Sequence, residues 1–407
     1  MNATAEQEKK FNYLFGLINF VVVFGIVMLL WFIFMHPKGP MQLYTPMYGF
    51  SLIVCFLTAI VLMIDVAGYY PFSESPSEKF GVIPRGITLT IVSVVLMLVL
   101  YYVVFVGFIG KFGVAYFSTK SLMAAGGMGS DLYIARESAS TALVWFFTAF
   151  LWMALSWNVG FGSWPWHKSE RGVLAWSKFF AIMFFSIIVF AVLFHPNVCY
   201  FFYPPQSKVG VVSWWASFTG TGSANFGLGL LIASLGWIIF SNLLWEGYPW
   251  KLMEKDGEGT ALKGIVTFVV TMALGIIMLL IVYQIMNWFW DTPFEGGQYT
   301  DAPYFRYLHV GEVSGFIILA AFILKTSFNN FPNINGLWPR AIIRTVIAIV
   351  GGIIIHIFYY STATVPLLGK TPGFAQPEDT PLVWTILYLS IIMIQDGFFD
   401  GWPLKKR

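Results

Sequence analysis

Three ionisable residues lie inside or beside long apolar stretches near the end of the chain. His309 and Glu312 are three residues apart and therefore share a helix face, and His356 lies in the next apolar stretch. A charged group inside a bilayer costs about 2.5–3.5 kcal/mol or more, so such residues are candidates for function. Two imidazoles and a carboxylate from adjacent helices suit a substrate or proton pathway. Their wide spacing is a weak signal for metal, and we predict no metal site.

The plainer alternative for this group is structural. His309 and Glu312 then lie in the headgroup zone, and His356 hydrogen-bonds a neighbouring helix. The sequence does not decide whether the three side chains converge.

A second set of polar residues lies where other apolar stretches end. Its members are Asp65, Asn158, Asn242, Glu246 and Asp396. Asn158, Asn242 and Asp396 each stand seven residues before a proline. We expect the set to line a vestibule that serves a substrate or proton pathway. The alternative is that each residue snorkels to the interface or caps a helix end.

A repeated cue accompanies these residues: a glycine close before a proline, usually with an aromatic beside it and a basic residue behind it. It occurs at 80–85, 162–168, 247–251, 336–340 and 401–405. Tryptophan, tyrosine and basic residues at the inner membrane face explain much of the pattern. A sharper hypothesis is a duplicated helical hairpin, with five units at residues 11–84, 85–165, 171–249, 260–339 and 340–403.

The elements that must position these residues are membrane helices. Hydrophobic residues make up 58% of the chain and charged residues 11%, whereas soluble domains carry about 25% charged residues. A bilayer core about 30 Å thick needs about 20 apolar residues per helix. Ten stretches qualify, at residues 13–35, 48–66, 87–110, 140–158, 172–194, 224–245, 263–290, 307–326, 341–361 and 382–397. We predict an all-α polytopic membrane protein with one integral-membrane domain, residues 1–407.

Charge placement predicts the orientation. Of the 23 Lys and Arg residues, 16 lie at the two ends of the chain or near the loops after even-numbered stretches, and 7 lie near the opposite loops. By the positive-inside rule, both termini are predicted to be cytoplasmic. The expected location is the cytoplasmic or inner cell membrane, which the chain crosses many times.

Composition and motifs narrow the function only to a class. The net charge of +3 has no basic block that would indicate nucleic acid, and the bilayer is the expected partner. No sequence motif identifies a catalytic residue or a cofactor. Fold-level analogy favours a secondary transporter or permease for a small solute, with Asp65, Asp396 or Glu312 available for proton coupling.

Two alternatives stay open. One is an integral-membrane subunit of a redox or other multiprotein complex that interacts with quinone or partner subunits. The other, weaker one is a membrane-embedded enzyme that uses His309, Glu312 and His356. The sequence also leaves open whether the chain forms a homo-oligomer.

Overall fold

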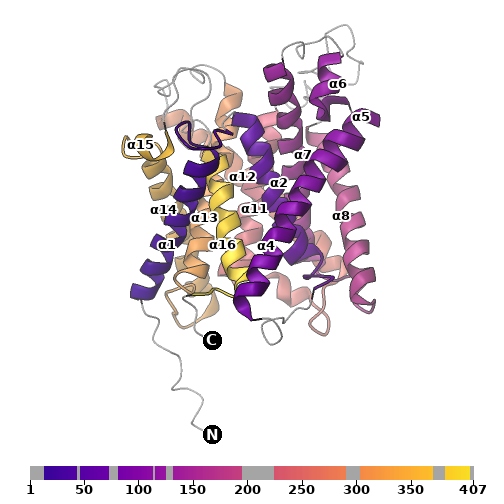
Figure 1. Cartoon of the computed structure of the whole chain (residues 1–407). Helices are drawn as coiled ribbons and strands as arrows, with labels where there is room; N and C mark the ends of the chain where they lie inside the picture. Colours follow the sequence, from indigo (N-terminus) through magenta and orange to yellow (C-terminus); the bar gives the residue numbers. More distant parts are fainter. Residues whose placement is uncertain are drawn as a thin grey trace.

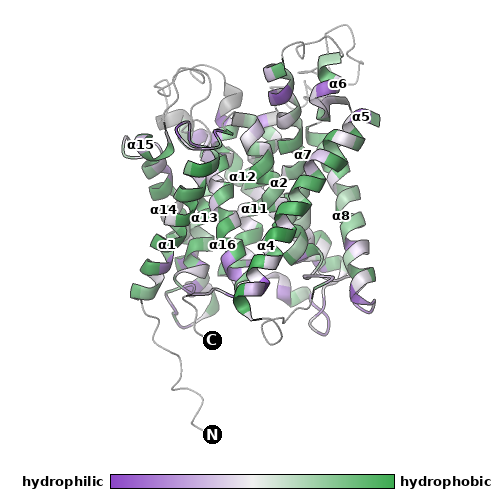
Figure 2. Cartoon of the chain, in the orientation of Figure 1, coloured by the Kyte–Doolittle hydropathy of each residue, from purple (hydrophilic) through white to green (hydrophobic). Residues whose placement is uncertain are grey.

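The computed structural model of the chain is a bundle of helices. It describes residues 13–43, 46–72, 81–112, 115–124, 132–194, 224–289, 303–369 and 381–403. Within these ranges ten helices are long and apolar enough to cross a membrane, which confirms the predicted class of multi-pass membrane protein. Figure 2 shows hydrophobic residues along the middle of the helices and more hydrophilic ones toward the two ends.

Several of the ten spans continue from an α-helix into a π-helical segment. In chain order they are α1 (Tyr13–Phe34), α2 (Pro46–Val61) with η1 (Leu62–Val66), α4 (Val82–Leu98) with η2 (Val99–Ile109), α7 (Leu132–Gly160), α8 (Arg171–Leu193), α11 (Ala224–Ile239) with η5 (Phe240–Leu244), α12 (Ala261–Phe289), α13 (Pro303–Thr326), α14 (Leu337–Tyr359) and α16 (Pro381–Met393) with η8 (Ile394–Phe398). Shorter helices lie between them: α5 (Gly110–Phe112), η3 (Ala115–Phe117), α6 (Thr119–Ala124), η6 (Trp250–Met253) and α15 (Val365–Leu368).

The spans alternate between two environments. In α2, α7, α11, α13 and α16, between 72% and 78% of the residues of the most apolar window are buried, whereas in the other five spans the share is 22–28%. The even-numbered spans are therefore inner helices and the odd-numbered spans are outer helices. The outer helices keep large apolar side chains exposed, such as Phe180 and Ile354, as a lipid-facing surface requires.

The five inner helices form a closed ring in chain order. α2 packs against α7, α7 against α11, α11 against α13, α13 against α16, and α16 against α2. Four outer helices pack against the inner helix that precedes them in the chain: α4 on α2, α8 on α7, α12 on α11 and α14 on α13. The first outer helix, α1, packs against the last inner helix, α16. Figure 1 shows that α1 begins and η8 ends at the same, lower end of the bundle.

Four inner helices end in the same backbone form. Two consecutive residues with positive φ terminate the helix, at Gly68-Tyr69, Glu246-Gly247, Asn329-Asn330 and Asp400-Gly401. The amide of the second residue donates to the carbonyl six residues earlier, as Gly247 does to Ser241 at 2.8 Å. Glycine and asparagine tolerate this left-handed conformation best, which accounts for them before the aromatic residue and proline. The peptide bonds that follow are cis, before Pro71, Pro249, Pro332 and Pro403, as is the bond before Pro165 in α7's terminal turn.

Two of the five repeated cues have a different role from the other three. Pro84 and Pro339 are the third residues of α4 and α14, whose N-caps are Gly81 and Gly336. Proline fits the first turn of a helix because its missing N–H has no partner to lose there. These two cues therefore begin outer helices. The boundaries of the predicted hairpin units after residues 84 and 339 fall inside the first turns of α4 and α14.

The helix α7 begins eight residues before its predicted start at residue 140. Its polar first turns are held by the neighbouring helix, since Glu137 accepts a 3.0 Å hydrogen bond from the amide of Met47 and Arg136 lies over the ring of Tyr48. Between α4 with η2 and α7, the described residues form the short helices α5, η3 and α6.

Candidate functional site

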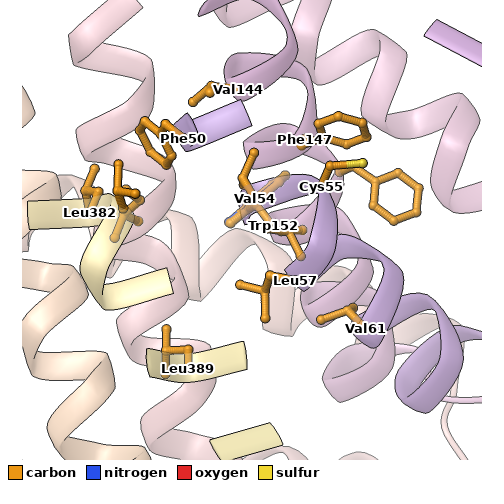
Figure 3. Packing of buried hydrophobic residues seen from close by; sticks show 14 of the residues in the cluster. Phe50, Val54, Cys55, Leu57, Val61, Val144, Phe147, Trp152, Leu382 and Leu389 are labelled. Carbon is orange, nitrogen blue, oxygen red and sulfur yellow. The ribbon is translucent and has the colours of Figure 1, made fainter. Parts of the chain in front are cut away.

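A cavity of about 220 Å³ lies among the five inner helices, each of which contributes to its wall. Most of the lining is aliphatic, including Leu57, Leu155, Leu235, Ile318 and Leu389. Figure 3 shows Leu382 and Leu389 of α16 across from Val54 and Leu57 of α2. The cavity therefore lies where the closed ring of inner helices has its axis.

Polar side chains reach this cavity at the end where the inner helices terminate. Asp65, Asn242 and Asp396 line it there, and Thr326 of α13 lies at the same helix end. The first three belong to the π-helical segments η1, η5 and η8, one in each. A π-helical segment inserts an extra residue into a turn, and such segments are frequent at functional sites.

Asp65 belongs to a polar triad that extends behind the cavity wall. The Asn158 amide donates to Asp65 Oδ1 at 2.8 Å. The ammonium group of Lys178, in α8, donates to the Asp65 carbonyl oxygen at 2.6 Å and to Asn158 Oδ1 at 3.1 Å. Lys178 is buried, so the triad places a buried positive charge against the backbone of Asp65, whose residue lines the cavity.

Glu246 lies outside the cavity and pairs with two arginines of α14. Arg340 and Arg344 each approach its carboxylate at 2.9 Å. Arg344 is buried and also donates to the carbonyl oxygens of Asn330 and Leu244. Partial burial alone raises the pKa of the Glu246 carboxyl, but the two arginines outweigh it and hold this pKa below its usual range.

The end of α16 has a matching ion pair. Arg85 of α4 donates to Asp400 at 3.0 Å and lies over the ring of Tyr69. Glu246 and Asp400 both stand three residues before a proline, and Arg340 and Arg85 are both the fourth residue of an outer helix. Both acids therefore join an inner helix to the start of an outer helix.

His309 and Glu312 contact each other, and Tyr360 lies between this pair and His356. His309 Nδ1 lies 2.6 Å from Glu312 Oε2, and both side chains are buried. The hydroxyl of Tyr360 donates to the same carboxylate oxygen at 3.3 Å, and the Tyr360 ring lies 4.9 Å from the ring of His356. Sequence reasoning placed His309, Glu312 and His356 together only as a hypothesis and missed Tyr360.

The predicted residues therefore fall into separate groups. Asp65, Asn242 and Asp396 share the axial cavity, Asn158 supports Asp65, and Glu246 lies in an ion pair at the helix ends. Sequence reasoning counted Lys178 and Arg344 as charges of the cytoplasmic face, although both fall inside predicted spans. A charge within an apolar stretch was the signal that could have identified them.

In the described part of the chain, no group of three His, Cys, Asp or Glu side chains is placed to hold a metal ion. Comparisons with protein-family models, with curated proteins and with solved structures gave no match.

Proposed function

We propose that this protein is a secondary transporter or permease that moves a small solute along the axis of its five inner helices. The observation that supports this most is the axial cavity, which all five inner helices line and which has polar groups at one end. A bundle held only by packing gains nothing from such a space, because an unfilled void loses dispersion contacts. A solute that enters from the polar end and is partly desolvated by the aliphatic wall accounts for both features.

Proton coupling in this proposal uses the two cavity carboxylates. Asp65 has the buried ammonium group of Lys178 close by, whereas Asp396 comes from the opposite end of the chain, on η8. Both carboxylates line the same cavity, so a proton or a cationic group that enters it reaches either one. Solute and proton then occupy the same space in turn.

We also propose that the chain consists of five duplicated helical hairpins. It crosses the inner cell membrane, and both of its termini lie in the cytoplasm. Support for duplication comes from the common helix ends, the matched ion pairs and a shared packing contact. Gly86 of α4 lies against Phe399, and Gly264 of α12 lies against Phe161. Both aromatic residues stand four positions before a proline. The orientation is supported by the excess of basic residues at the end of the bundle that carries the cavity's polar groups.

Reconstitution into liposomes tests the transport proposal. A panel of small anionic, neutral and cationic solutes is offered with and without a pH gradient, and solute uptake and internal pH are recorded. We expect at least one solute to enter faster than in protein-free liposomes and Asp396→Asn to reduce that uptake by about tenfold or more, as for loss of a group that binds in the pathway. The matched control is Asp256→Asn, at an exposed loop position with positive φ that asparagine also tolerates. Wild-type uptake in Asp396→Asn would remove Asp396 from the mechanism.

The second candidate function is an integral-membrane subunit that interacts with quinone or partner proteins. The observation that favours it is the largely aliphatic wall of the cavity, which also suits an apolar ring. Purification in mild detergent distinguishes the two functions. A subunit co-purifies with a stoichiometric partner, and a transporter of the proposed kind is stable and active alone.

A further inference from the structure

We infer that His309 and Glu312, together with Tyr360 and His356, form a proton-binding site separate from the axial cavity. All four residues come from α13, α14 or the turn that ends α14. The site binds a proton whether or not a solute moves through the ring, so it stands independently of the proposed transport.

The geometry of the pair suits one shared proton. His309 Nδ1 and Glu312 Oε2 are 2.6 Å apart, which is at the short end of hydrogen-bond distances. The exposed fractions of the two residues are 7% and 3%, so neither is solvated by bulk water. A pair that holds one proton is neutral as a whole, and an apolar environment favours that state over a lone charge. Gain or loss of a further proton changes the charge of a buried group.

The location of the pair separates it from the polar end of the cavity. Glu312 is 14 residues before Thr326, which lies at that end, so the two are about 21 Å apart along α13 at 1.5 Å per residue. Gly315, which lines the cavity, is only three residues after Glu312. The pair therefore lies about one helical turn from the cavity wall and far from Asp65 and Asp396.

Two neighbours on the outer helix complete the site. Tyr360 donates its hydroxyl hydrogen to the carboxylate oxygen that faces His309. His356 lies beside Tyr360 and against Phe316, with ring centroids 4.9 Å and 5.7 Å apart respectively. Tyr360 thus stabilises the charged carboxylate, and His356 supplies a second imidazole that can accept a proton.

The helices packed against α13 bring few other titratable groups to this site. On α13 itself, Arg306 is one turn before His309, and Tyr307 stacks on Tyr283 of α12. The described residues of α11 and α16 include no charged side chain, although Tyr388 of α16 is buried nearby in the aromatic cluster around Trp384. The only charged residue of α12, Lys263, begins that helix and pairs with Glu254. Among the described residues, His309, Glu312, Tyr360 and His356 are therefore the titratable groups that contact one another at this site.

Nuclear magnetic resonance of the full chain in lipid nanodiscs tests the site. The five histidines are labelled with ¹⁵N, and single His→Gln variants assign their signals. We expect Glu312→Gln to lower the pH midpoint of the His309 signal by about one unit or more, a tenfold loss of proton affinity, because the carboxylate partner is gone. We expect Tyr360→Phe to raise the pH midpoint of the His309 signal. Without the hydroxyl that stabilises the charged carboxylate, the pair holds its proton a few times more tightly.

The control is the signal of His36, whose ring accepts a hydrogen bond from the Lys38 amide and which neither substitution touches. Opposite shifts at His309 with an unchanged His36 support the site, since a purely structural role gives no such pair of signs. If Glu312→Gln does not fold, the upward shift in Tyr360→Phe decides alone. Two results overturn the inference. In one, the proton affinity of His309 in the folded variants stays within about twofold of wild type. In the other, His309 does not titrate at all.

Discussion

Replacement of Lys178 by methionine tests whether the triad beside the cavity is an electrostatic unit. Methionine keeps most of the length and apolar contacts of the lysine stem but removes the ammonium group. The Asp65 carboxylate then keeps the hydrogen bond from Asn158 but has lost a nearby positive charge, and the Asp65 carbonyl and Asn158 Oδ1 have lost their donor. Loss of a buried donor costs about 1–3 kcal/mol, and loss of a buried counter-charge raises the cost to about 3–5 kcal/mol.

The structure favours the lower end of that range. Asp65 is only partly buried and faces the cavity, so water there can solvate part of its charge. At about 3 kcal/mol, and with an unfolding entropy of about 2.1 cal/mol/K per residue over 407 residues, we expect Lys178→Met to lower the unfolding temperature by roughly 3–4 °C. Intrinsic-fluorescence melting in detergent micelles measures this. Lys168→Met is the matched control at an exposed position, with an expected change within about 0.5 kcal/mol.

The double variant Lys178→Met with Asp65→Asn makes the reasoning refutable. If the cost of Lys178→Met is an uncompensated carboxylate, neutralising that carboxylate restores at least about 1 kcal/mol, although it adds a second substitution. If the cost is lost packing, the double variant is no more stable than Lys178→Met alone. That result, or a single variant as stable as wild type, would refute the electrostatic account of the triad.

Two further predictions concern the ion pairs at the helix ends. We expect Arg344→Gln to destabilise the protein by about 3 kcal/mol, because it leaves buried acceptors on Asn330 and Leu244 without their donor. We expect Arg340→Gln to cost only about 1 kcal/mol, because Arg340 is partly exposed. Equal shifts in melting temperature for the two variants would contradict this difference. The Glu246 carboxyl has a lowered pKa in the folded protein, so it binds fewer protons folded than unfolded. Its stabilising effect is therefore complete above the ordinary glutamate pKa of about 4.3 and is lost as the pH falls through the lowered value. The melting difference between wild type and Glu246→Gln measures this, and a difference that grows on acidification would show the sign to be wrong.

Much of the fold could be predicted because a membrane helix is a local property. Ten apolar stretches of about 20 residues predicted all ten spans in the described residues. The earlier starts of α4 and α14 were also readable, since a proline three residues into a span fits the first turn of a helix. The division into inner and outer helices is also visible in the hydropathy of the spans. As a group the outer spans are more apolar than the inner ones, because inner helices face other helices and tolerate serine, threonine and glycine.

The candidate site was harder to predict because it depends on long-range packing. Asp65, Asn242 and Asp396 come from three helices, and only the closure of the ring brings α16 back to α2. Asn242 and Asp396, each seven residues before a proline, line the cavity, whereas Asn158 with the same spacing donates a hydrogen bond to Asp65 behind the wall. The proline that follows the end of the inner helix α13 is Pro332, whereas Pro339 lies in the first turn of α14, a distinction that only the backbone shows.

Reactivity of an engineered cysteine on the cavity wall tests the central claim most directly, namely that solute passes along the axis of the inner ring. Leu235 of α11 lines the cavity, while Ile276 of α12 is exposed on the lipid-facing side. The two lie at the same depth, because Gly275 packs against Ser234. The background carries Cys55→Ala and Cys199→Ser, and the probe is a charged, water-soluble thiol reagent applied to liposomes. The account predicts that Leu235→Cys reacts at least about tenfold faster than Ile276→Cys, because water and solute reach only the axis. Equal or slower reaction at Leu235→Cys would contradict a pathway through the ring.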